Sequence, residues 1–295
     1  MVFTLLDTVS LVSTSVLSNP DELVSDPTFA IGLILIGLMV GIAIGLSGLG
    51  GAPLLLPSLV LIGIPPQIVI GADLAFIFGT KLFASILHGK ERNINWKALV
   101  FLLIPVVPVM LFASWVWTGI KENYGSDILD TVILLLLGTI LIGISLYMIK
   151  NNVLKKNNLN VISEHPTTRK FTRGEKTTFL GASSIISFIT QITATGAGAM
   201  TLPLLIKKCH CPPKHVAGTS VLFGVAISAV GTILHYNMGN VPFLLVLFLL
   251  IGSIPGVFLG VKLTSKISPR KLIATFSIII LIAAIFLLNR GFGII

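Results

Sequence analysis

The chain has 295 residues, of which 54% are hydrophobic and 11% are charged, and its mean hydropathy is +1.01. A soluble domain usually carries about 25% charged residues, so this composition excludes an ordinary globular enzyme, a disordered protein and a secreted disulfide scaffold. The net charge of +9 would suggest nucleic acid in a soluble chain, but the basic residues here stand in short loops between apolar runs, as they do in membrane proteins. We therefore expect an all-α, polytopic helical membrane protein with no nucleic-acid partner.

Eight apolar runs are long enough to cross the hydrocarbon core as helices, which takes about 20 residues. They cover residues 28–47, 66–88, 98–118, 128–149, 177–194, 213–235, 241–262 and 270–289. Two shorter runs, 52–63 and 199–206, each follow a glycine-rich break. Because a helix rises only about 1.5 Å per residue, we expect each short run to be a half-helix. Each would form a broken hairpin with the helix before it, surrounded by protein or by a water-filled cavity.

The polar segments divide the chain into four predicted parts. Residues 1–27 are acidic and form an expected extracytoplasmic segment, and 150–176 form a basic cytoplasmic linker. A first transmembrane repeat at 28–149 and a second at 177–295 stand on either side of this linker.

The two transmembrane halves match at a constant spacing. The matched pairs, at an offset of 147, are Pro65-Pro66 with Pro212-Pro213, Gly71 with Gly218, Phe76 with Phe223, His88 with His235, Asn93 with Asn240 and Pro108 with Pro255; at 146 they are Gly50 with Gly196 and Pro57 with Pro203. Proline, histidine, asparagine and glycine at one spacing are hard to attribute to composition. The sequence therefore predicts an internal repeat.

The basic loops predict how the repeats are oriented. Placing 89–97, 150–176, 207–214 and 262–271 in the cytoplasm puts 17 of the 20 lysines and arginines there, in agreement with the positive-inside rule. Both termini then lie outside the cell, and the second half crosses the membrane in the opposite sense to the first. Inverted repeats are the architecture of many secondary transporters, whose substrate sites lie near the midplane. This arrangement requires each glycine hairpin to return to its own side.

The two glycine breaks are candidates for a substrate site. A helix that begins inside the membrane points unpaired N–H groups and a partial positive charge at the cavity. Two such ends would form an anion site, to which hydroxyl and amide side chains add contacts. The candidate residues at the breaks are Ser47, Gly48, Gly50, Gly51, Gln191, Thr193, Thr195, Gly196 and Gly198. The alternative is that the glycines only allow close helix packing.

Two charged residues fall within the predicted span 66–88, where charge is costly and usually faces an interior cavity. Asp73 and Lys81 are eight residues apart, about 12 Å along a helix axis, so we expect no direct pairing. Lys81 could neutralise an anionic substrate, with Thr80, Thr219 and Ser220 lining the same cavity, or it could extend toward the cytoplasmic face. Asp73 could exchange protons.

Histidine and cysteine offer further candidates. His88 and His235 occupy matching helix ends and could relay protons, although packing or helix capping is the simpler interpretation. Cys209 and Cys211 are poorly spaced for a disulfide, and with His210 and His215 they could bind a soft metal only in a strained loop. We expect a reduced loop, with no metal and no cofactor.

Five aromatic residues near the ends of spans are expected to be interfacial anchors. They are Trp96, Trp115, Trp117, Tyr124 and Tyr236.

The glycine-rich stretch that leads into Gly50-Gly51-Ala52-Pro53-Leu54-Leu55-Leu56-Pro57 resembles the signature of the TauE/SafE family of sulfite and organosulfur anion exporters. Its second copy, Gly196-Ala197-Gly198 through Pro203, and the element Ala217-Gly218-Thr219-Ser220 are similar to the same family. The resemblance covers about residues 30–290 and implies transport of sulfite, sulfoacetate or a similar small anion. The sequence departs from the family pattern in its thinner second glycine cluster and in Asp73 near the expected site.

The leading hypothesis is a multi-pass secondary transporter of the cell membrane that exports a small, sulfur-containing anion by alternating access. Its partners would be the anion and the lipid bilayer, with a homodimer as one assembly that the sequence allows. The alternative is a proton- or cation-coupled carrier in which Asp73 is the ion ligand. An intramembrane enzyme would need an acid pair, a metal-ligand set or an activated nucleophile at depth, and we expect no enzymatic activity.

Overall fold

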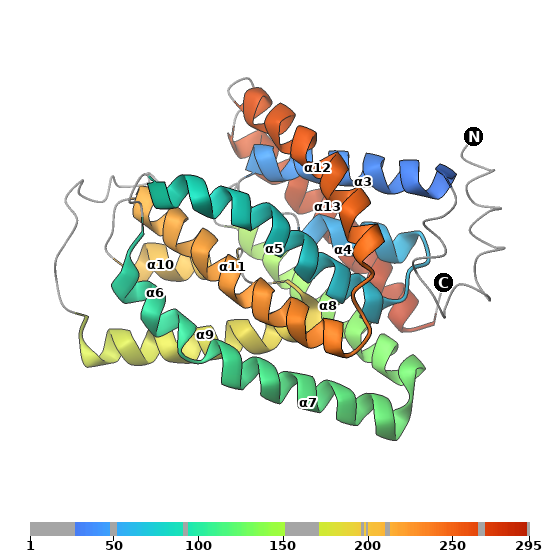
Figure 1. Ribbon diagram of the computed structural model, residues 1–295, viewed down its shortest axis with the longest axis horizontal. Helices are drawn as coiled ribbons and strands as arrows, with labels where there is room; N and C mark the ends of the chain where they lie inside the picture. The colour runs from blue at the N-terminus through green and yellow to red at the C-terminus, as the bar shows by residue number, and fades with distance from the viewer. Residues whose placement is uncertain are drawn as a thin grey trace.

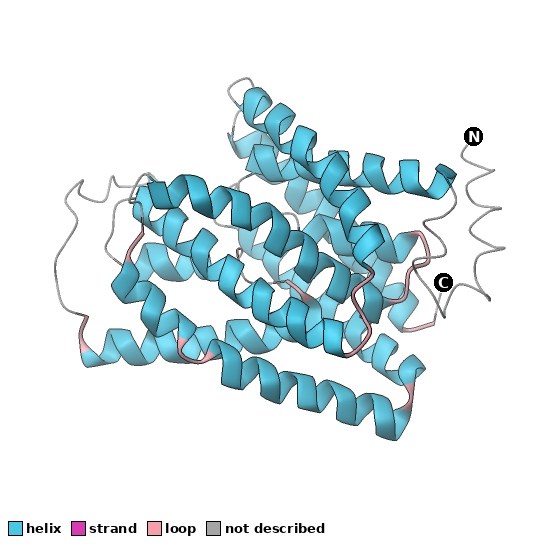
Figure 2. Ribbon diagram, in the orientation of Figure 1, coloured by secondary structure: helices cyan, strands magenta, loops and turns pink. Residues whose placement is uncertain are grey.

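The computed structural model of the chain is built from helices (Figures 1 and 2). It describes residues 27–47, 52–90, 94–150, 171–195, 198, 200–209, 213–264 and 269–293. Within these residues there are eleven helices and no strand. The helices are α3 (Pro27–Ser47), α4 (Ala52–Leu61), α5 (Pro66–Lys90), α6 (Trp96–Leu103), α7 (Val106–Tyr124), α8 (Ser126–Met148), α9 (Arg173–Thr193), α10 (Thr201–Lys208), α11 (Pro213–Asn237), α12 (Phe243–Thr264) and α13 (Pro269–Gly291). The predicted all-α class is confirmed.

Six stretches of the described helices are long and apolar enough to cross a membrane. They are Pro27–Leu46, Trp96–Tyr124, Ser126–Met148, His215–Asn237, Phe243–Gly260 and Ala274–Gly291. Two other predicted spans fold as the long helices α5 and α9, of 25 and 21 residues. Asp73, Thr80 and Lys81 lie on α5, and Gln191 and Thr193 lie on α9.

The two short runs that follow the glycine breaks fold as short helices. The α4 helix has 10 residues and α10 has 8, so neither is long enough to cross the hydrocarbon core.

One predicted span lies within the stretch Trp96–Tyr124 but is divided between two helices. The run 98–118 is not a single helix, because the chain makes a turn at Ile104-Pro105 between α6 and α7. Proline has no N–H to donate and its ring crowds the preceding turn, which explains the interruption.

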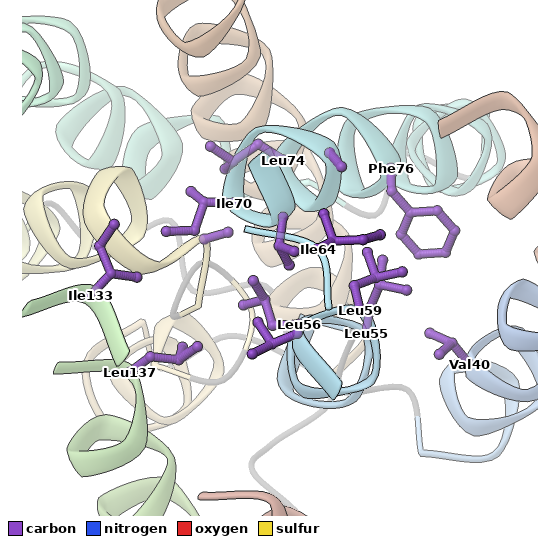
Figure 3. Packing of buried hydrophobic residues seen from close by; sticks show 14 of the residues in the cluster. Val40, Leu55, Leu56, Leu59, Ile64, Ile70, Leu74, Phe76, Ile133 and Leu137 are labelled. Carbon is purple, nitrogen blue, oxygen red and sulfur yellow. The ribbon is translucent and has the colours of Figure 1, made fainter. Parts of the chain in front are cut away.

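The half-helix α4 is enclosed by other helices (Figure 3). Leu55, Leu56 and Leu59 are fully buried and belong to a core that also contains residues of α3, α5 and α8. Figure 3 shows Ile133 and Leu137 of α8 on one side of these leucines. Non-helical backbone at membrane depth needs such an enclosure, and α4 has it.

Three helix pairs define the relative directions of the helices. Cβ atoms added to Gly252, Gly256 and Gly260 of α12 would collide with the backbone of α3 at Ile34, Leu38 and Ile42 respectively, so α3 and α12 are parallel. In α5 and α11, Leu74 lies at Gly231 and Lys81 at Gly224, so this pair is antiparallel. The pair α8 and α13 is also antiparallel. Gly138 of α8 lies at Leu288 and Ala284 of α13, whereas Ser145, later in α8, bonds to Ser277, earlier in α13.

Contacts between segments far apart in sequence show which helix ends lie on the same side of the bundle. At one end, Arg290 donates to the carbonyl of Val60 in the last turn of α4, and Gln67 donates to the carbonyl of Ser126. At the other end, Asn95 contacts Cys209 after α10 and Thr219 of α11. Each half-helix therefore ends at the same side of the bundle as the start of the following long helix.

Candidate functional site

Lys81 lies in the contact between α5 and α11, which run side by side in Figure 1. A Cβ atom added to Gly224 of α11 would collide with the Cδ, Cε and Nζ atoms of Lys81. The lysine side chain is half-buried and lies directly across the backbone of α11 at this glycine. The ammonium group therefore lies between helices from the two halves of the chain.

Asp73 lies on the same helix and is fully buried. Both carboxylate oxygens lack a hydrogen-bond partner among the described residues, so Lys81 does not bond to them. An unpaired carboxylate at membrane depth is costly and usually marks a functional position.

The other residues predicted to line this cavity have local partners. Thr80 donates its hydroxyl to the carbonyls of Phe76 and Ile77 at 2.9 and 3.1 Å. The hydroxyl of Thr219 donates to the carbonyl of His215 at 2.6 Å and accepts from the Asn95 N–H at 2.8 Å. Ser220 is buried next to Thr219 on α11. Thr219 thus links α11 to the beginning of α6.

The second glycine break begins with an unusual backbone. Ala194, which ends α9, has φ of 51°, in the left-handed region that favours glycine. The hydroxyl of Thr195 donates to the carbonyl of Thr193 at 2.8 Å and lies 3.0 Å from the Thr193 hydroxyl. Gly198 accepts a backbone hydrogen bond from Leu202 at the start of α10. All three side chains from Thr193 to Thr195 are buried.

A buried group of polar side chains joins α7, α9 and α11 beside this break. Gln191 donates its amide to the Ser114 hydroxyl at 2.9 Å, and its backbone carbonyl lies 3.0 Å from Nε2 of His235. The His235 ring meets the Trp117 ring edge to face, with centroids 5.0 Å apart. We call Ser114, Trp117, Gln191 and His235 the polar cluster. The structure thus brings together Gln191 and His235, which the sequence assigned to different roles.

Several of the predicted site residues lie outside the part of the chain that the structure describes. Gly48, Gly50, Gly51 and Gly196 lie outside the described residues, as do the side chains of Ser47 and His88. Whether the two glycine breaks meet therefore remains a prediction.

Two expectations about side chains are wrong. Trp117 is only 2% exposed and packs on His235, because it shares the buried face of α7 with Ser114. The expected anchors Trp96 and Trp115 are 63% and 71% exposed, as a lipid-facing position requires. Cys209 is disulfide-bonded rather than reduced. Among the described residues, no group of three or more His, Cys, Asp and Glu side chains could hold a metal ion.

Sequence comparison places these features in a known family. The family model described as sulfite exporter TauE/SafE matches residues 33–287, which is most of the chain. The chain belongs to the TauE/SafE family. It is a multi-pass membrane transporter of that family.

The TauE/SafE relatives carry general names. The chain is 29% identical over 258 residues to probable membrane transporter protein YjnA of Bacillus subtilis (strain 168), an alignment that covers 87% of this chain and 98% of the relative. It is 28% identical to probable membrane transporter protein MJ0441 of Methanocaldococcus jannaschii, over 87% of this chain and 94% of that protein. No solved structure matches this TauE/SafE chain significantly.

Proposed function

We propose that the protein exports a small, monovalent, sulfur-containing anion such as hydrogen sulfite or a sulfonate by alternating access. The observation that carries this proposal is the position of Lys81 across α11 at Gly224. A cation between the two halves of the chain can attract an anion to the interface where the substrate sites of repeat transporters lie. The family model, described as sulfite exporter TauE/SafE, supports the sulfur oxyanion and the outward direction.

The packing of the helices supports the inverted repeats on which alternating access depends. The offset of 147 makes α5 and α11 counterparts and also α8 and α13, and each of these pairs packs antiparallel. The counterpart of the α3–α12 contact is the contact of α9 with α6 and α7, which is also present. In inverted repeats, a helix at the interface packs antiparallel against its own counterpart. A contact between two different helices occurs twice, the second time with the halves exchanged. Rocking of one half against the other would then expose Lys81 to each side in turn.

The proposed substrate is tested by binding and flux. Purified protein is screened by thermal shift against sulfite, sulfate, thiosulfate and sulfonates, and the ligands that bind are then followed across proteoliposomes. We expect hydrogen sulfite or a sulfonate to raise the melting temperature and to cross faster than in empty vesicles. Folded protein that neither binds nor moves any of these anions would reject the substrate class.

A second candidate function is a cation carrier, which the unpaired carboxylate of Asp73 favours. The Asp73→Asn variant distinguishes the two. If Lys81 binds an anion, removing the nearby negative charge should tighten anion binding by about 3- to 10-fold, the effect of one like charge at an effective dielectric constant near 20. If Asp73 is the ion ligand, the same variant should lose cation binding. Titration of both variant and wild type with sulfite and with Na⁺ by calorimetry measures the difference.

A further inference from the structure

The polar cluster contains three buried polar atoms that have no hydrogen-bond partner among the described residues. They are Nε1 of Trp117, Oε1 of Gln191 and Nδ1 of His235. All three side chains have exposures of 2% or less. Leaving a buried polar atom unpaired costs about 1–3 kcal/mol, and three such atoms in residues that contact one another indicate a site where something binds during function.

The hydrogen bond to Gln191 sets the chemistry of His235. A backbone carbonyl only accepts, so Nε2 of His235 must carry the hydrogen, and we assign this tautomer from the bonding pattern. In the neutral ring Nδ1 is then a free acceptor. A proton taken up at Nδ1 would give an imidazolium, whose Nε2–H bond to the carbonyl would be roughly twice as strong as the neutral one.

The charged residues in the interior indicate that His235 could compensate the charge of a bound anion. Lys81 and Asp73 place one formal positive charge and one formal negative charge on α5. An anion that binds at Lys81 therefore adds one uncompensated negative charge at a depth where net charge is costly. Among the fully buried described residues, Asp73 and His235 are the side chains able to exchange a proton, apart from the disulfide-bonded Cys209.

We propose that His235 takes up one proton together with each anion, so that the loaded transporter carries the two across as a neutral pair. The proton comes from water on the loading side, forms an N–H bond at Nδ1, and returns to water when the anion leaves. No other bond is made or broken. This inference rests on the proposed anion transport. It adds Trp117 as the neighbour of the proton-binding ring and reassigns Gln191 from the anion to the proton site.

The groups around His235 are compatible with this role. Trp117 of α7 and Gln191 of α9 are the residues that contact the ring, and neither titrates near neutral pH. On α5, Asp73 makes no hydrogen bond to any described residue, and Lys81 lies at Gly224, eleven residues before His235 on α11.

The remaining charges near α11 lie away from the ring. Lys97 of α6 and Lys207 of α10 are exposed and Lys208 is half-buried, and the end of α10 lies with the beginning of α6 at the opposite end of α11. The two charged residues that follow Trp117 on α7, Lys121 and Glu122, are exposed as well. In the empty protein a buried imidazole without a charged partner stays neutral.

The polar cluster also contacts the end of α9. Gln191 lies three residues before Ala194, where α9 ends at the second glycine break. Its carbonyl is one of the last-turn acceptors that a helix leaves without an internal partner, and His235 donates a hydrogen bond to it. A stronger bond in the protonated state would hold the end of α9, so proton uptake and the conformation of the break are coupled. Coupling between two sites is reciprocal.

Trp117 makes the proposal directly measurable, because a protonated imidazole in contact with an indole quenches its fluorescence. Trp96 and Trp115 are highly exposed, so the W96F/W115F variant should fold and report on Trp117 alone. Hydrogen sulfite added to this variant at a fixed, mildly acidic pH should quench Trp117. The matched control adds His235→Asn, whose amide can still donate to the Gln191 carbonyl but cannot take up a proton. It should bind more weakly and show no quenching.

Flux gives a second readout. In proteoliposomes with His235 intact, an imposed membrane potential should leave hydrogen sulfite movement unchanged, since the loaded site is neutral; with His235→Asn, the same potential should alter the remaining movement. If the anion crosses but Trp117 stays bright and the potential controls wild-type flux, the proton pairing is wrong while anion transport stands. If no anion binds or crosses, the proposed function fails and takes this inference with it.

Discussion

Replacing Lys81 with methionine is expected to lower anion affinity by about 30- to 150-fold. Methionine keeps the length and most of the volume of the side chain that lies against Gly224, but removes the charge. Losing one member of a desolvated charge pair typically costs 2–5 kcal/mol, and about 2–3 kcal/mol corresponds to this change in affinity. The measurement is the sulfite or sulfonate titration of the thermal shift, followed by flux in proteoliposomes.

The matched control is Lys121→Met. Lys121 lies near the end of α7 and is exposed, so the variant removes the same charge without touching the interior. It should bind and transport like the wild type. If the Lys81→Met variant binds the anion as tightly as the wild type, and the melting temperature of the empty protein is unchanged, the proposed site is contradicted. That result would favour the cation carrier in which Asp73 is the ion ligand.

The order of the helices could be predicted because hydropathy and helix breaks are local properties of the sequence. Apolar runs of spanning length and glycine-rich breaks were enough to place both half-helices, α4 and α10, within a few residues. The turn at Ile104-Pro105 was missed, although proline gave the signal. In an otherwise continuous apolar run, nothing local shows whether a proline bends a helix or divides it.

The contacts within the site depend on how helices are aligned in space, which hydropathy does not encode. The position of Lys81 at Gly224 is such a contact. The repeat held a partial signal, since the counterparts of this pair are Ser228 and Ile77, again one small and one large side chain. Trp117 could have been separated from Trp115 by helical periodicity, because residues two apart face different directions.

The second large effect is expected on stability, from Gly252→Ala in the α3–α12 pair. The added methyl group would collide with the backbone carbonyl of Ile34 and lie 2.9 Å from the Leu38 nitrogen. A backbone cannot rotate away as a side chain can, so the two helices must separate. Overpacking of this kind costs about 2–3 kcal/mol, which should appear as a lower midpoint of denaturant or thermal unfolding in detergent.

Gly32→Ala is the matched control on the same helix pair. A Cβ atom at Gly32 would meet nothing within 4 Å, and alanine is favoured over glycine in a helix by about 1 kcal/mol, so this variant should be neutral or more stable. Destabilisation by both variants alike would show that the contact is not the cause. Because α3 ends at the first glycine break, a separation of α3 from α12 should also disturb that break. Gly252→Ala should therefore weaken anion binding as well as stability, whereas Gly32→Ala should change neither adversely.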